Sequence, residues 1–155
     1  MRLQQNTLLA LYSVLEFAAH PGRHLSASEI AAKYRMSPHH LAKVLRSLGR
    51  ARLVSAVRGV GGGYRFSGNV KRVTLMDVIE LFEDISAPQR SAVRGSRGGA
   101  GGRGTSGTGA AAFEVEQALG VVLAEIDEIA RATFRSITLD TMLKLVERRR
   151  AAVRR

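Results

Sequence analysis

The side chains with the clearest chemical meaning are basic ones that follow one another without an intervening acid. No Asp or Glu lies between Glu29 and Asp77. An unbroken positive field over one structural unit attracts polyanions, and the chain of 155 residues carries a formal net charge of +11. A merely solvated basic face is the alternative. The interval contains ten basic residues: Lys33, Arg35, Lys43, Arg46, Arg50, Arg52, Arg58, Arg65, Lys71 and Arg72.

A glycine-rich loop lies inside this interval, between two strand-like runs at residues 53–57 and 64–66. Glycine permits positive φ and lets backbone N–H groups approach phosphates. Arg58 stands at the end of the first run, and a narrow minor groove attracts an inserted arginine. We therefore predict a β-hairpin wing whose tip contacts DNA, and a plain hairpin loop is the alternative. The predicted contacts at this tip are Arg58, Gly59, Val60, Gly61 and Gly62.

Two short helices joined by a tight turn precede the hairpin. Ser26 and Glu29 have the spacing of a capping box, and Ser37 followed by Pro38 predicts the cap and first position of the second helix. In a helix–turn–helix, the second helix lies in the major groove with its N-terminal residues on base edges. One side of that helix is apolar and is expected to be buried: Leu41, Val44, Leu45 and Leu48.

The outward side of the same helix carries the predicted DNA contacts. His39, His40 and Lys43 lie near its N-terminus and can reach bases, whereas Arg46 and Arg50 suit phosphates. The start of the preceding helix adds two hydroxyls and free N–H groups that can grip a phosphate. The full set predicted on the two helices is Ser26, Ser28, Ser37, Pro38, His39, His40, Lys43, Arg46 and Arg50.

These residues need a scaffold, which two further helices supply. Residues 7–19 place one apolar stripe on a helix, and Thr74 begins another helix with Asp77 as its capping partner. The predicted fold is mostly α with a small β-hairpin, and residues 1–85 form a winged helix–turn–helix domain. The stripe of the first helix is Leu8, Leu11, Tyr12, Leu15 and Ala18.

The C-terminal part has a different character. Residues 86–112 are rich in glycine and serine with scattered arginines, which predicts a flexible linker. Residues 113–149 are expected to form two helices, at 113–134 and 138–149, and residues 150–155 an unstructured basic tail. The first of these helices has a heptad-like seam that favours a homodimer, and folding back on its own domain is the alternative. The predicted dimer interface is Val115, Leu119, Val122, Leu123, Ile126 and Ile129.

Several functions are excluded or disfavoured by composition. The chain has no cysteine, so it has no disulfide, thiolate metal site or cysteine-held iron–sulfur cluster. Four histidines lack the spacing of a metal site, and no catalytic constellation is identifiable, so we expect neither a cofactor nor an enzyme. Without an apolar run of about 18 residues or a signal peptide, the protein is expected to be cytoplasmic and away from membranes.

The sequence resembles the IscR/NsrR-type bacterial regulators over residues 1–85. The resemblance rests on Met1-Arg2-Leu3, on segments 26–30, 37–45, 49–53 and 74–79, and above all on the phrase at 53–64. It implies a homodimeric winged-helix transcription regulator, usually a repressor, on a palindromic operator. It also implies that Ser37, His39, His40 and Lys43 occupy recognition positions, that Arg58-Gly59 is a minor-groove wing and that residues 113–134 form the crossed dimer helix.

One departure from that family is large. Many members hold an iron–sulfur cluster through three cysteines between the fourth and fifth helices, and a fourth ligand can come from the first helix. Here residues 86–112 have no cysteine, and the first helix offers the apolar Leu8. We therefore predict no cluster. Members of the CymR type are controlled by a partner enzyme, and control by a partner protein, by a small molecule or by neither stays open.

We predict a cytoplasmic, dimeric, sequence-specific regulator that binds double-stranded DNA and acts as a repressor. Two alternatives stay open from the sequence. The first is a protein-interaction module or sensor, controlled by a partner protein, for which DNA binding is secondary. The second is an RNA-binding winged helix.

Overall fold

The structure is a computed structural model that describes residues 3–83 and 108–154, with side chains from 113 onward in the second range. The described residues belong to two compact units. One lies within Met1–Glu83 and Thr133–Arg155, and the other lies within Asp84–Ala132. Because the predicted DNA contacts all fall in the first unit, that unit is the one that positions them.

Helix α1 (Gln5–Ala19) is the centre of the first unit, in contact with α3, α4, α6 and β2. Because neighbouring elements contact this helix on several sides, its buried residues do not form a single stripe. They differ in part from the residues that were predicted to be buried. Val14 and Phe17 are fully buried, whereas Leu8 and Tyr12 from the predicted stripe are 36% and 42% exposed. The predicted face was therefore partly wrong, although Leu11 and Ala18 are buried as expected.

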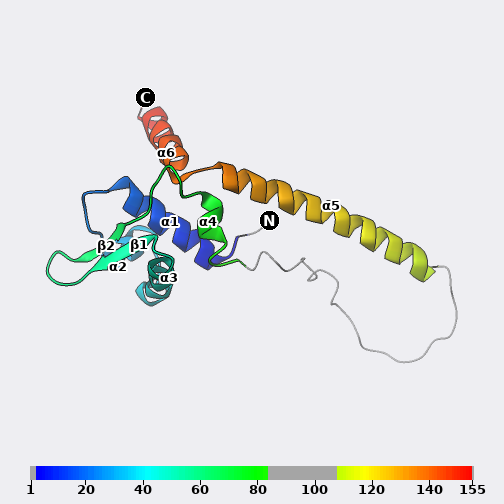
Figure 1. The fold of residues 1–155 in the computed structure, drawn as a ribbon, viewed down its shortest axis with the longest axis horizontal. Coiled ribbons are helices and arrows are strands. Elements are labelled where there is room, and N and C mark those ends of the chain that lie inside the picture. The colour runs from blue at the N-terminus through cyan, green and yellow to red at the C-terminus, as the bar shows by residue number, and fades with distance from the viewer. Residues whose placement is uncertain (1–2, 84–107, 155) are drawn as a thin grey trace. The chain divides into compact units, whose positions relative to one another are not determined.

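Helices α2 (Ala27–Lys33) and α3 (Pro38–Arg50) form the helix–turn–helix (Figure 1). The capping box of Ser26 and Glu29 is confirmed, and so is the buried stripe of α3. The turn between the helices passes through Arg35 at φ +53°, a left-handed conformation that ends α2. Ser37 is the N-cap residue of α3, as predicted, but its side chain makes no capping hydrogen bond.

Strands β1 (Val54–Val57) and β2 (Gly63–Phe66) form the antiparallel hairpin, with Val54 opposite Phe66 and Val57 opposite Gly63. The segment before α2 adds a short third partner. The N–H of Leu25 donates to the Tyr64 carbonyl at 2.9 Å, and the N–H of Tyr64 donates back at 2.8 Å. The hairpin is thereby joined to the helix–turn–helix at its base.

Helices α4 (Leu75–Ile79) and α6 (Leu139–Val153) complete the first unit. The segments leading into them pair through Leu75 N–H to the Ile137 carbonyl and Leu139 N–H to the Val73 carbonyl, both at 2.9 Å. Helix α6 continues to Val153, so residues 150–153, of which Arg150 is basic, lie on a helix and the prediction of an unstructured tail was wrong there. Arginines near a helix C-terminus interact favourably with its dipole, which explains why the helix continues.

Helix α5 (Thr108–Ser136) begins five residues before the predicted position, inside the segment predicted to be a linker. Residues 108–112 are therefore helical. The rest of the linker prediction, residues 86–107, lies outside the described residues. No helix in the described ranges is long and apolar enough to cross a bilayer.

Candidate nucleic-acid interface

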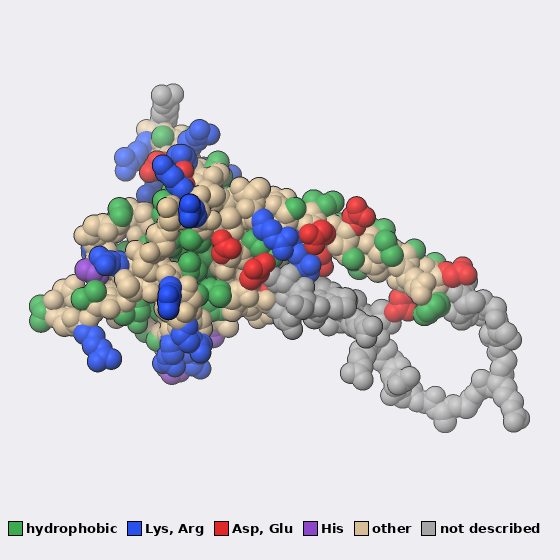
Figure 2. Space-filling view, in the orientation of Figure 1, with side chains coloured by type: hydrophobic (Ala, Val, Ile, Leu, Met, Phe, Trp, Pro, Cys, Tyr) green, Lys and Arg blue, Asp and Glu red, His purple; other side chains and the backbone are tan. Residues whose placement is uncertain are grey.

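The outward side of α3 is a cationic surface free of acids. Its predicted contact residues are all exposed, while the opposite side of the helix is buried against α1 and α2. Figure 2 shows Lys, Arg and His side chains gathered over α3 at the bottom of the view. This arrangement keeps the helix fixed on one side and presents cations on the other. The exposed set is Ser37, Pro38, His39, His40, Lys43, Arg46 and Arg50.

The wing follows directly from α3. The chain leaves the helix through Arg52 at φ +59°, and the N–H of Leu53 donates to the Leu48 carbonyl at 3.0 Å. The Ser67 hydroxyl from the far end of the hairpin donates to the Arg52 carbonyl at 2.8 Å. Helix α3 is also in contact with β1. These bonds hold the hairpin at a fixed place beside α3 (Figure 1).

The tip of the wing has the exposure that a contact with a groove requires. Arg58, Gly59, Val60 and Gly61 are exposed, and Arg58 has no ion-pair partner among the described residues. Gly59 and Gly61 have φ values of +104° and +75°, which only glycine adopts without strain.

Gly62 is required for the space around it rather than for a positive φ. Its N–H donates to the Gly59 carbonyl at 2.9 Å, which closes the turn tightly. A Cβ on Gly62 would lie 2.3 Å from the Val57 carbonyl oxygen, so the tight turn excludes any side chain.

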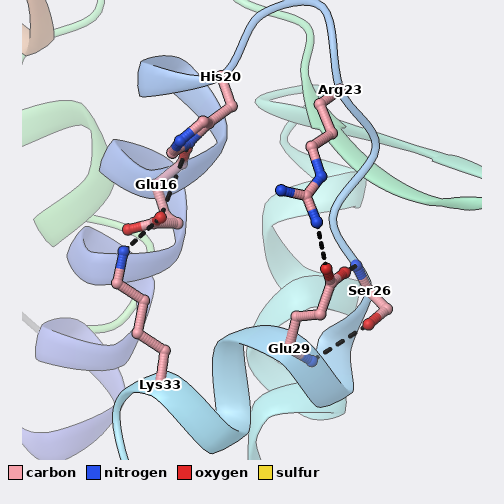
Figure 3. Close-up of polar contacts among 6 residues, drawn as sticks. All are labelled: Glu16, His20, Arg23, Ser26, Glu29 and Lys33. Atoms are coloured by element: carbon pink, nitrogen blue, oxygen red, sulfur yellow. Dashed lines mark hydrogen bonds and ion pairs between the residues drawn. The ribbon is translucent and has the colours of Figure 1, made fainter.

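The start of α2 differs from the prediction of a phosphate grip. The Ser26 hydroxyl accepts from the Glu29 N–H at 3.1 Å, and the Ser26 N–H donates to Glu29 Oε2 at 2.7 Å (Figure 3). The Ser26 N–H is therefore already engaged by a carboxylate, whereas the hydroxyl hydrogen of Ser26 is still able to donate. Arg23 Nη2 pairs with Glu29 Oε1 at 2.6 Å. Hydrogen bonds from Ser26 hold the pKa of Glu29 below its usual value. Of the two predicted serines, Ser28 is exposed.

A buried carboxylate that the sequence analysis missed fixes α2 on α1. Glu16 accepts from Lys33 Nζ at 2.6 Å and from the Tyr34 hydroxyl at 2.9 Å, and His20 Nδ1 lies 3.7 Å from its Oε1. Figure 3 shows Lys33 and His20 converging on Glu16.

Glu16 and Tyr34 shift each other's pKa. Burial raises the pKa of Glu16, but the hydrogen bonds from Lys33 and Tyr34 outweigh it, so the pKa is lowered. Burial, with Glu16 beside it, raises the pKa of Tyr34 to about 12. Only the interruption of an apolar helix by one acid could have indicated Glu16 from the sequence.

The described residues contain no group of three His, Cys, Asp or Glu side chains that could hold a metal ion. His20 donates through Nδ1 to the Glu16 carbonyl oxygen at 2.9 Å, and His40 bonds to Asn6. These two histidines therefore have structural partners, and a cationic surface for a polyanion is the chemistry that this unit offers.

Helix α5 carries the predicted dimer seam on an open surface. The exposed fractions of these apolar side chains are 60% for Val115, 57% for Leu119, 55% for Val122, 57% for Leu123, 51% for Ile126 and 61% for Ile129. Apolar side chains that recur along one helix at such exposure are typical of a surface that another helix covers.

Comparison with known proteins gives concordant results. The family model Rrf2, described as an iron-dependent transcriptional regulator, matches residues 3–145. The chain is 47% identical over 155 residues to a Rhodopseudomonas palustris protein named as the HTH-type transcriptional regulator BadM, covering all of this chain and 89% of that protein.

Two solved structures have the same fold. CymR (YrzC) of B. subtilis, titled the global cysteine regulator, has a TM-score of 0.67 at 21% identity and covers 94% of this chain and 98% of its own. IscR of T. potens has a TM-score of 0.58 at 22% identity, with 94% and 88% covered. The mostly helical architecture with an antiparallel hairpin and long C-terminal helices is thereby confirmed.

Proposed function

The chain belongs to the Rrf2 family of transcriptional regulators, and we propose that it binds a specific duplex DNA sequence as a homodimer and represses transcription there. The observation that carries the proposal is the acid-free cationic side of α3 with an exposed arginine on the wing beside it. Because duplex DNA is found in the cytoplasm of a bacterial cell, we also place the protein there.

The position of each residue along α3 determines whether we assign it to a base or to a phosphate. His39 and Lys43 lie in the first two turns of α3, where side chains reach base edges. Arg46 and Arg50 lie nearer its end and suit phosphates. Arg58 at the wing suits the minor groove, where negative potential is enhanced.

The exposed apolar seam of α5 supports the dimer. A helix of 29 residues is about 44 Å long at 1.5 Å per residue, which is long enough to pack along a second copy. A twofold dimer presents two recognition helices and two wings, and it therefore reads a palindromic operator.

The proposed regulator works without a cysteine-ligated cluster. The Rrf2 family is described as iron-dependent, but this chain has no cysteine, so the thiolates that such a cluster needs are missing. Control by a partner protein, control by a small molecule and constitutive binding are the three remaining types of regulation.

A gel-shift titration with the DNA upstream of the protein's own coding region tests the proposal. We expect saturable binding that weakens steeply as salt rises, because phosphate contacts release counterions. Arg58→Ala should weaken binding, and Lys43→Ala should in addition relax base preference by about 1–3 kcal/mol at one base pair.

The charge-matched control is Arg149→Ala on α6, which lies at the opposite end of the unit from α3 in Figure 1. If all three variants bind like the wild type, the contact surface is wrong. If the wild type prefers no duplex sequence over any other, the proposed function is wrong.

A further inference from the structure

A hydrogen bond connects the first turn of α1 to the recognition helix. The Oδ1 atom of Asn6 lies 2.5 Å from Nε2 of His40, 34 residues further along the chain. Asn6 is half-buried and His40 is exposed. The bond therefore fixes a side chain on the very surface that we assign to base recognition.

The chemistry of the pair decides which nitrogen of His40 carries a proton. A neutral imidazole has one N–H donor and one acceptor nitrogen, and the partner of one nitrogen sets the role of the other. An amide oxygen only accepts, so Nε2 of His40 must carry the hydrogen. The second ring nitrogen, Nδ1, is then left as an acceptor.

The residues on either side of Asn6 are tied to Glu83, from the other end of the domain. Gln4 is the N-cap of α1, and its side chain makes no capping hydrogen bond. Glu83 Oε1 instead accepts from the Gln4 N–H at 2.7 Å and from the Thr7 hydroxyl at 2.5 Å. Thr7 is fully buried. The backbone on both sides of Asn6 is thereby fixed.

We propose that Asn6 is a specificity-determining positioning residue, which holds His40 as the Nε2–H tautomer so that Nδ1 accepts a hydrogen bond from a base. In the major groove, the bases that present an amino donor are adenine, through N6, and cytosine, through N4. His40 therefore selects adenine or cytosine at its operator position. This inference rests on the proposed function and adds a residue outside the helix–turn–helix to it.

Selection from a randomised duplex library, with the full chain, tests the inference. Wild type should prefer adenine or cytosine at one position in each half-site, and His40→Ala should lose that preference. Asn6→Ala should reduce the same preference severalfold, because the His40 ring then loses its fixed orientation as well as its fixed tautomer. Asn6→Asp should also weaken it near neutral pH, because a carboxylate favours the imidazolium form, in which both ring nitrogens donate. Gln5→Ala is the matched control, since Gln5 is an exposed amide on the same turn.

A second measurement is independent of DNA. Nitrogen-15 NMR of the histidine rings at about pH 8.5, where imidazole is neutral, should show His40 as the Nε2–H tautomer in the wild type and as a mixture in Asn6→Ala.

The outcomes separate the two proposals. An Nδ1–H tautomer in the wild type, or an unchanged base preference in Asn6→Ala, overturns the inference alone. Failure of the wild type to select any duplex sequence overturns the proposed function, and the inference with it.

Discussion

Replacing Lys33 by Met should destabilise the DNA-binding unit, because Glu16 then loses its cationic partner. The Glu16 side chain is 11% exposed and the Lys33 side chain is 47% exposed. Exposed pairs contribute about 0–1 kcal/mol, whereas breaking a fully buried pair costs about 3–5 kcal/mol. This half-buried pair lies between them, so we expect a loss of about 2 kcal/mol and a fall in Tm of about 10 °C.

The loss should depend on pH in a defined direction. A carboxyl group whose folded pKa is lowered, as that of Glu16 is, adds stability above its unfolded pKa, and this stability is lost as pH falls through the folded value. In Lys33→Met, burial still raises the pKa of Glu16 and the lysine no longer lowers it, so this pKa is higher than in the wild type. The difference between wild type and variant should therefore be complete at pH 7 and should close below about pH 4.

Urea unfolding followed by circular dichroism, at pH 7 and at about pH 4 and at one protein concentration, measures both effects. Lys33→Met combined with Glu16→Gln should recover most of the loss, because the neutral amide still accepts from Tyr34 and no unpaired charge is buried. Lys71→Met is the control, since Lys71 is an exposed lysine of the same unit. Wild-type stability of Lys33→Met at pH 7, or a deficit of equal size at both pH values, would refute the reasoning.

Two further predictions concern the wing and the dimer. Gly62→Ala should lower DNA affinity about tenfold with little change in Tm, because the loop must open to move Cβ away from the Val57 carbonyl. Gel shift and thermal melting measure the two effects, and Val60→Ala at the same tip is the control. Ile126→Asp should convert the dimer to a monomer in sedimentation analysis, whereas Glu125→Gln on the same helix should not. An unchanged dimer in Ile126→Asp would exclude the seam on α5.

The parts of the fold that follow from local rules were predictable from the sequence. The capping box at Ser26, the buried stripe of α3 and the glycine hairpin each depend on residues a few positions apart. Their backbone and periodicity requirements can be stated without knowing the tertiary structure. The position of the proposed DNA-binding surface was predicted on that basis.

The features that were missed depend on contacts between distant segments. The buried face of α1 is set by four neighbouring elements, so a single stripe could not describe it. The burial of Glu16 was not predicted, because its partners, Lys33 and Tyr34, lie 17 and 18 residues away. The contact of Asn6 with His40 and that of Gln4 with Glu83 span 34 and 79 residues. Helix periodicity carries no information about such pairs.

The glycines of the wing differ in how they tolerate a change in chain length. Nothing lies within 4 Å of a Cβ built on Gly59 or Gly61, so inserted residues would extend outward from the turn. A Cβ on Gly63 would lie 2.7 Å from the Leu25 carbonyl oxygen, and the next residue pairs with Leu25 through both backbone groups. An insertion there would shift the strand past its neighbour. Proteins built on this plan can therefore lengthen the reach of the wing at its apex while its root keeps a constant length.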